Sequence, residues 1–243
     1  METDRLIYYH EGTPCHGFIA WDESSEVKRP AILIAHAWRG QDDFARQKAI
    51  EIASMGYIGF AIDIYGEGKC VPNEEAQGLR DPFFFDRKLL QARMNAALDF
   101  IKKHPRVDPE KVAAIGFCFG GLCVYELLRS GADIKGVVTF HGIFAFSQEG
   151  KHVKEVTISS KILGKILVLH GAQDPLVSDT DLKFVQKEMT DANVDWQMHI
   201  FGNAMHAFTN PNAKDPKKGT LYDPISEKRA WELMQIFLDG LFI

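Results

Sequence analysis

Hydrophobic and polar positions alternate along the chain in two repeating patterns. Short apolar runs such as 31–36 and 57–63 contain few polar residues, which is typical of strands buried on both faces of a sheet. Between such runs lie segments with apolar residues at helical spacing, as in 43–55 and 85–103. This alternation predicts an α/β fold in which helices cover both faces of a mostly parallel sheet.

The same patterns predict the remaining elements. Two runs joined by the turn Glu11-Gly12-Thr13-Pro14, 6–10 and 16–21, indicate an N-terminal antiparallel hairpin. Further strands are expected at 111–116, 134–141, 165–171 and 195–201, and further helices at 119–129, 179–190 and 226–238. Segments 64–84 and 142–163 fit no element, and we expect them to be functional loops. Because no repeat or low-complexity stretch interrupts this order, we expect one domain over residues 1–243.

Composition then narrows the classes of partner. The 243 residues are 46% hydrophobic and 25% charged, which is typical of a globular chain. A net charge of −5 without a basic stripe argues against nucleic acid as a partner. The N-terminus lacks an apolar signal core, and the longest weakly polar run, 112–125, is too short to span a bilayer, so no membrane role is expected. Four cysteines without a C-x-x-C pair favour a reducing cytoplasm.

The most specific motif is Gly116-Phe117-Cys118-Phe119-Gly120-Gly121, which lies between a predicted strand and a predicted helix. It has the G-x-nucleophile-x-G pattern of a nucleophile elbow, with cysteine in place of serine. The central residue takes a strained backbone, and its neighbours must be small because strand and helix pass close together. The N-terminus of the new helix also favours a thiolate. We therefore expect Cys118 to be a nucleophile.

A thiol nucleophile needs a base, and the base needs an orienting group. Asp174 follows the buried run 165–171, and His206 follows the last predicted strand. Ligands of such sheets bind beyond the carboxyl ends of the strands, where both residues are expected to lie. The order Cys118, Asp174, His206 is the nucleophile, acid, histidine order of α/β-hydrolases. The sequence therefore predicts a Cys–His–Asp triad.

Other residues compete for these roles. His141 and His170 also end strands and could serve as the base, but both precede Asp174, which is the wrong order. Asp179 and Asp181 suit the N-cap and first turn of the following helix instead. The remaining cysteines lack the turn context, and a free cysteine is usually a small buried apolar residue.

Acyl transfer also needs two backbone N–H groups for the oxyanion. One is expected from Phe119, the residue after the nucleophile. The other is expected from the loop after the strand at 31–36, where Trp38 is the best-placed donor.

Together these residues resemble the dienelactone hydrolase family of the α/β-hydrolase fold. The resemblance rests on the segments 116–121, 171–174 and 202–208, and it extends from about residue 12 to the C-terminus. It implies hydrolysis of lactones or small esters by the Cys–His–Asp triad, with neither a metal nor an organic cofactor. A thioester acyl-enzyme is the expected intermediate.

Two positions depart from the pattern of that family. Well-studied members have a glutamate beside the thiol, in line with Ala37, and a carboxylate-binding arginine four residues after the histidine, in line with Asn210. Asparagine cannot replace the bidentate contact of a guanidinium with a carboxylate. We therefore expect neutral esters or lactones to be preferred. Four other arginines could supply an anion contact, although surface charge is the simpler interpretation: Arg39, Arg80, Arg87 and Arg93.

Several residues are expected to line the substrate pocket. The stretch 81–85 either presents aromatic rings to the site or packs under the following helix. The expected lining set is His36, Ala37, Phe83, Phe84, His141, Phe208 and Asn210.

Three other functions compete with this prediction. A dinucleotide-binding fingerprint would need glycine at position 118 and an acidic residue closing the next strand, and neither is present. A thioesterase or peptidase of the same fold, and a non-catalytic binding protein, stay open as alternatives. The expected partner is a small-molecule ester or lactone, and the expected assembly is a monomer or small homo-oligomer.

Overall fold

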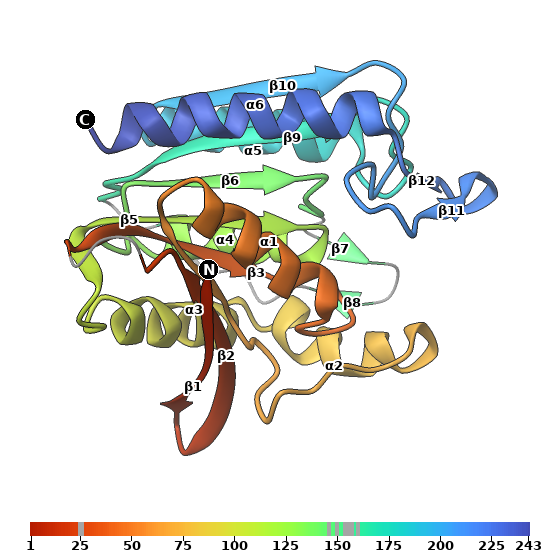
Figure 1. The fold of residues 1–243 in the computed structure, drawn as a ribbon. Coiled ribbons are helices and arrows are strands. Elements are labelled where there is room, and N and C mark those ends of the chain that lie inside the picture. The colour runs from red at the N-terminus through yellow and green to blue at the C-terminus, as the bar shows by residue number, and fades with distance from the viewer. Residues whose placement is uncertain (24–26, 145–146, 149–150, 153–157, 159–160) are drawn as a thin grey trace.

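The computed structural model describes residues 1–243 except 24–26, 145–146, 149–150, 153–157 and 159–160. Its largest sheet has eight strands in the order β1-β2-β4-β3-β5-β6-β9-β10 (Figure 1). In chain order these are β1 (Glu2–His10), β2 (Thr13–Trp21), β3 (Arg29–Ala35), β4 (Ile58–Ala61), β5 (Val107–Phe117), β6 (Gly136–Phe140), β9 (Lys165–Gly171) and β10 (Trp196–Phe201). Strands β1 and β2 pair antiparallel, β2 is antiparallel to β4, and the remaining neighbours are parallel. The predicted mostly parallel sheet with its N-terminal hairpin is confirmed.

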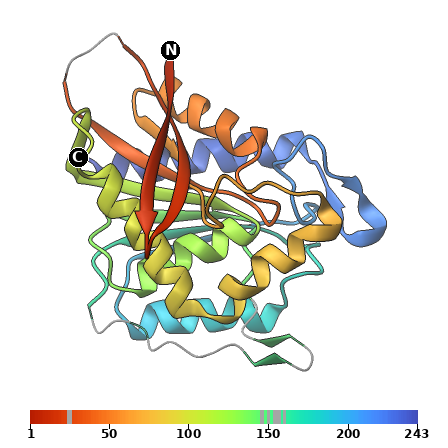
Figure 2. The ribbon, with the colours of Figure 1, turned by 90° about the horizontal axis from the view of Figure 1, so that it is seen from below.

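Helices cover both faces of this sheet, as Figures 1 and 2 show. The helices are α1 (Asp43–Ser54), α2 (Asn73–Phe85), α3 (Arg87–Ile101), α4 (Phe119–Arg129), α5 (Asp179–Asp191) and α6 (Pro224–Leu241). Their buried side chains form two clusters: α1 and α6 contribute to one, and the other four helices to the second. Every residue of β4 and β6 is buried, because each of these strands packs against helices on both faces. No helix in the described part of the chain has the length and apolar character needed to cross a membrane.

The second of the predicted loops contains two short paired strands, β7 (Ser147–Gln148) and β8 (Lys151–His152). Much of the rest of 142–163 lies outside the described residues. Near the C-terminus, β11 (Lys214–Asp215) and β12 (Thr220–Leu221) form a second small ribbon around a 3-10 turn, Pro216–Lys218.

The prediction that 64–84 fits no element is wrong, because α2 occupies its second half. Gly78 and Pro82 lie inside this helix and weaken its helical signal in the sequence. Its buried residues nevertheless have helical spacing: Ala76, Arg80, Phe83 and Phe84. Tertiary burial of this face therefore outweighs the local cost of a proline.

One helix start and one N-cap also differ from the prediction. Helix α3 begins after Asp86, whose carboxylate accepts a hydrogen bond from the N–H of Leu89 at 3.1 Å. The N-cap of α5 is Ser178 rather than Asp179, and Ser178 forms a reciprocal capping box with Asp181.

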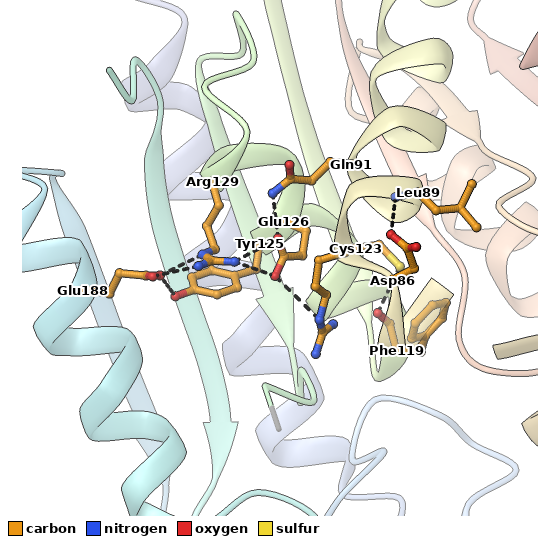
Figure 3. Close-up of polar contacts among 10 residues, drawn as sticks. Asp86, Leu89, Gln91, Phe119, Cys123, Tyr125, Glu126, Arg129 and Glu188 are labelled. Atoms are coloured by element: carbon orange, nitrogen blue, oxygen red, sulfur yellow. Dashed lines mark hydrogen bonds and ion pairs between the residues drawn. The ribbon is translucent and has the colours of Figure 1, made fainter. Parts of the chain in front are cut away.

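A buried charge network ties α3, α4 and α5 together (Figure 3). Glu126 on α4 is completely buried and accepts hydrogen bonds from Arg129 at 2.8 Å and from Gln91 on α3 at 2.8 Å. Arg129 also donates to Glu188 on α5 at 2.9 Å, and the hydroxyl of Tyr125 donates to the same carboxylate. Because a buried charge without a partner is costly, these contacts fix how the three helices pack under the sheet.

Candidate active site

Cys118 lies at the junction between β5 and α4, in a backbone conformation that side chains rarely adopt. Its φ is 56° and its ψ −116°. The N–H of Cys118 donates to Phe140 O at 3.1 Å, and its carbonyl accepts from the N–H groups of Gly121 and Ile143 at 3.0 and 3.2 Å. These three bonds to neighbouring elements hold the strained turn in place.

The glycines around Cys118 are required by close backbone approach. A Cβ on Gly116 would lie 2.0 Å from Gly120 O, and a Cβ on Gly120 would lie 2.1 Å from Ala35 O. Contacts this short with backbone atoms cannot be relieved by a side-chain rotation. The start of α4 therefore packs directly against the end of β3 and of its own preceding strand, as the elbow motif predicts.

His206 and Asp174 form a buried hydrogen-bonded pair. Nδ1 of His206 lies 2.7 Å from Oδ2 of Asp174, and the two residues are 3% and 6% exposed. The other carboxylate oxygen of Asp174 accepts from the N–H of Leu176 at 2.9 Å. The backbone of His206 donates to Gly219 O and accepts from the N–H of Leu221, so the β11–β12 region holds the histidine loop.

The electrostatics of His206 couple it to Cys118. Burial disfavours the imidazolium, but the charge of Cys118 and the hydrogen bond to Asp174 outweigh burial and raise the pKa of His206 to about 10. Nε2 of His206 is buried and has no hydrogen-bond partner of good geometry among the described residues. The thiol therefore raises the pKa of the imidazole through its charge and its proximity.

The two competing histidines have different surroundings. His141 has its Nε2 2.8 Å from Thr209 Oγ1, and its ring stands edge-on to that of His206 with centroids 5.2 Å apart. Burial lowers the pKa of His141 well below its ordinary value, and the charge of His206 lowers it further. Burial also lowers the pKa of His170. Neither residue has a carboxylate hydrogen-bonded to its ring among the described contacts, whereas His206 is paired with Asp174.

The two predicted oxyanion donors come from neighbouring segments. Phe119 is the first residue of α4 and is completely buried. Trp38 lies in the loop after β3 and is partly buried. The ring of Tyr65 lies beside Phe119, and its hydroxyl donates to Trp38 O at 2.7 Å.

The residues expected to line the pocket divide into two groups. Ala37 and Asn210 are partly exposed, and Oδ1 of Asn210 accepts from the N–H of Asn212 at 2.9 Å. The other five residues are at least nine-tenths buried: His36, Phe83, Phe84, His141 and Phe208.

Within the second group, Phe84 belongs to the core. Its ring packs against the guanidinium groups of Arg80 and Arg87, each 4.7 Å from the ring centroid. Phe83 packs against Tyr65, and Phe208 packs edge-on against His141 at 5.3 Å. Phe83 and Phe84 are therefore packed in the interior, against Tyr65, Arg80 and Arg87.

The interpretation of four arginines as surface charges is wrong for three of them. Arg80, Arg87 and Arg93 are 9%, 1% and 5% exposed. Arg80 pairs with Asp81, and Arg93 donates to Ile64 O at 2.8 Å. Arg87 is packed near Glu126 in the charge network, with its Nε 3.9 Å from the carboxylate. The fourth, Arg39, is partly buried and donates to Val71 O at 2.9 Å.

None of the other three cysteines occupies the strained position between β5 and α4. Cys15 and Cys123 are buried, as expected, and Sγ of Cys123 lies 3.2 Å from Phe119 O. Cys70 is exposed, so the expectation that it is buried is wrong. Among the described residues, no group of three or more His, Cys, Asp or Glu side chains is arranged to hold a metal ion.

Two residues that contact predicted site residues were not themselves predicted: Tyr65 and Thr209. Tyr65 follows the carboxyl end of β4, and Thr209 follows His206 by three residues. The position of Tyr65 just past a strand end was a usable signal. Thr209 carried no signal, because its contact with His141 joins residues 68 positions apart.

Comparison with known proteins identifies the family. The sequence model of the dienelactone hydrolase family matches residues 16–242. The chain belongs to the dienelactone hydrolase family. It is 26% identical to the "Putative carboxymethylenebutenolidase" of Aquifex aeolicus, with 91% of each chain covered. A dienelactone hydrolase-like promiscuous phosphotriesterase from metagenomic libraries superimposes with a TM-score of 0.92 at 35% identity, covering 100% of this chain and 99% of the other.

A second solved structure, that of m3DLH, superimposes with a TM-score of 0.90, also at 35% identity, covering 100% of this chain and 99% of the other. These matches confirm the resemblance inferred from the three motifs. The protein is a dienelactone hydrolase-like enzyme that hydrolyses esters or lactones.

Proposed function

We propose that this protein hydrolyses neutral esters or lactones through a thioester on Cys118, with His206 as base and acid and Asp174 as its orienting group. One observation carries the proposal. The strained turn of Cys118 is electrostatically coupled to a buried histidine that is itself hydrogen-bonded to a carboxylate at 2.7 Å. A nucleophile, a base and a group that orients the base are the three parts of a catalytic triad.

The first half of the reaction transfers the acyl group to sulfur. The Cys118 thiolate attacks the carbonyl carbon, and the resulting oxyanion accepts hydrogen bonds from the N–H groups of Phe119 and Trp38. The imidazolium of His206 then protonates the leaving alkoxide oxygen as the C–O bond breaks. The alcohol leaves, or stays attached in the case of a lactone, and a thioester remains on Cys118.

In the second half of the reaction, hydrolysis of the thioester, His206 must act as a base. The influences on its pKa support this role. The charge of Cys118 is the leading influence that raises the pKa of His206. A thioester carries no such charge, while the burial that lowers this pKa persists. In the acyl-enzyme the pKa of His206 is therefore lower than in the free enzyme, which favours the neutral imidazole that can act as a base. It takes a proton from water, the hydroxide attacks the thioester, and the Cys118 thiolate leaves as the acid is released.

Preference for a neutral substrate follows from the cations around the site. The position expected to hold a carboxylate-binding arginine is Asn210, whose Oδ1 is used in its own turn. The four arginines considered as replacements are bound to other groups: Arg39, Arg80, Arg87 and Arg93. A substrate carboxylate would gain no bidentate partner from the three that are buried, Arg80, Arg87 and Arg93.

Phosphotriester hydrolysis is a second candidate activity of the same site. The phosphotriesterase to which this chain is 35% identical over its full length is described as promiscuous. A phosphotriester is also neutral, and the thiolate could attack phosphorus and displace an alkoxide just as it displaces one from an ester. Turnover of an aryl dialkyl phosphate by the wild type, lost in Cys118→Ala, would support this activity.

The decisive test of the ester reaction is the covalent intermediate. Incubation with a p-nitrophenyl ester and intact-mass analysis should show one acyl adduct, and peptide mapping should locate it on Cys118. Cys118→Ala should lose the adduct and at least ~10³-fold in kcat. Cys70→Ala is the matched control, since its thiol is exposed and far in sequence from the elbow, and it should keep both. An active, acylated Cys118→Ala enzyme would refute the proposal.

This chemistry also bears on where the protein works. A thiol nucleophile must stay reduced, and the four cysteines are free thiols. We therefore place the enzyme in the cytoplasm as part of the same proposal.

A further inference from the structure

The loop after β3, residues 36–40, is held by side chains from two directions. Nδ1 of His36 lies 2.7 Å from Ala37 O, and Nε2 of His36 lies 3.2 Å from the N of Ile64. Because the N–H of Ile64 is a donor, Nε2 must be the acceptor and Nδ1 must carry the proton. His36 is completely buried, and burial lowers its pKa, so this neutral tautomer persists.

Tyr65 holds the next carbonyl of the same loop. Its hydroxyl donates to Trp38 O at 2.7 Å. Its ring stacks on Phe119 at an interplanar angle of 21° with centroids 6.1 Å apart, and it meets His36 edge-on at 4.8 Å. Tyr65 therefore touches both segments that carry the two proposed oxyanion donors.

The turn that carries Tyr65 is itself firmly fixed. The buried carboxylate of Asp63 accepts hydrogen bonds from three backbone N–H groups: Gly66 at 2.9 Å, Gly68 at 2.8 Å and His16 at 2.9 Å. A hydroxyl anchored on such a turn can restrain the position of a neighbouring loop.

Because peptide units are planar, these two restraints also fix the direction of the Trp38 N–H. The carbonyl of Ala37 and the N–H of Trp38 belong to one planar unit, so fixing the C=O fixes the opposite direction of the N–H. His36 and the N–H of Gly40, at 3.2 Å, both bind that carbonyl. Tyr65 binds the carbonyl of the following unit. The N–H of Trp38 is therefore restrained on both sides.

We propose that Tyr65 and His36 are positioning residues that aim the Trp38 N–H at the oxyanion, a role that rests on the function proposed above. Neither side chain contacts the substrate in this scheme. Their contribution is to hold a backbone donor still, so that it need not reorganise as charge develops on the substrate oxygen.

The test is Tyr65→Phe, which keeps the ring and removes only the hydroxyl. Two reactions of the same thiol are compared: acylation by a p-nitrophenyl ester, which forms an oxyanion, and alkylation by iodoacetamide, which does not. Outright removal of an oxyanion donor costs about 10²–10³ in kcat, so a loosened donor should cost about 10-fold. We expect that loss in the acylation rate and kcat, little change in KM, and an unchanged alkylation rate.

A binding measurement checks the same point without turnover. A trifluoromethyl ketone forms a hemithioketal with the thiol, and the oxyanion of this adduct accepts hydrogen bonds from the two proposed N–H donors. The affinity of the enzyme for this inhibitor should fall by a similar factor in Tyr65→Phe. The matched control is Tyr57→Phe, which loses a hydroxyl bonded to Asp239 at 2.9 Å, outside the site. It should leave both reactions and the inhibitor affinity unchanged.

Two results would overturn the inference. One is wild-type acylation and inhibitor affinity in Tyr65→Phe. The other is an equal loss in acylation and alkylation, which would mean that Tyr65 supports the thiol rather than the oxyanion donor. Failure of the proposed function is separate, because it would appear in the wild type as acylation at a residue other than Cys118.

Discussion

Replacing Gly120 by alanine should damage activity more than it damages the fold. A Cβ at this position would lie 2.1 Å from Ala35 O and 2.7 Å from His36 O, both backbone atoms. Restoring ordinary van der Waals contact requires the start of α4 to move by roughly 1 Å away from the end of β3. Overpacking of this kind costs about 1–3 kcal/mol of unfolding free energy. A displacement of ~1 Å between catalytic groups costs about 10²-fold in rate.

The assay measures both quantities on the same preparation. Urea unfolding gives the free energy, and hydrolysis of a neutral p-nitrophenyl ester gives kcat. Gly78→Ala is the matched control, because Gly78 lies inside α2 with no atom within 4 Å of the added Cβ. It should be stabilised by about 0.5–1 kcal/mol, with kcat unchanged. If Gly120→Ala keeps wild-type kcat, the close packing of the elbow on β3 is not what positions the thiol.

The other predictions concern charge. Asp174→Asn should fold but lose about 10²–10⁴-fold in kcat, because the imidazole of His206 is no longer held in the required tautomer; steady-state kinetics with a circular dichroism check measures this. Asn210→Arg should raise kcat/KM for an ester carrying a free carboxylate by about tenfold, measured against a matched neutral ester, and a wild type that already prefers the charged ester would contradict it. NMR titration should show His206 protonated up to a pKa of about 10, and this pKa should be lower in Cys118→Ala; equal values in both proteins would remove the inferred coupling. Because the pKa of His206 is raised on folding, its stabilisation is complete below pH 6.5 and is lost as pH rises through about 10, which pH-dependent urea unfolding measures. Glu126→Leu should cost about 3–5 kcal/mol in urea unfolding, since it leaves buried arginines without their carboxylate; a loss under 1 kcal/mol would show that the network contributes little.

Much of the fold and the candidate triad could be predicted from local pattern. The run 165–171 and the helix 119–129 were predicted with the bounds that the structure has, because buried apolar runs and amphipathic spacing are local properties. The triad candidates followed from a rule of topology. Parallel strands end at one edge of the sheet, so residues that follow different strands must gather there. The sharp turn at Cys118 could also be predicted from its flanking glycines, because two backbones that pass so close together leave no room for a side chain.

The features that could not be predicted from the sequence depend on contacts between residues far apart in the chain. Helix α2 is stabilised by burial of a face that its own glycine and proline obscure. Arg87 and Arg93 look like surface charges until the elements that bury and pair them are in place. The hydroxyl of Tyr65 has a role only because β3 and β4 are neighbours in the sheet, which brings it to a carbonyl 27 residues away. Periodicity reports which face of an element is buried, whereas these features depend on which element it is buried against.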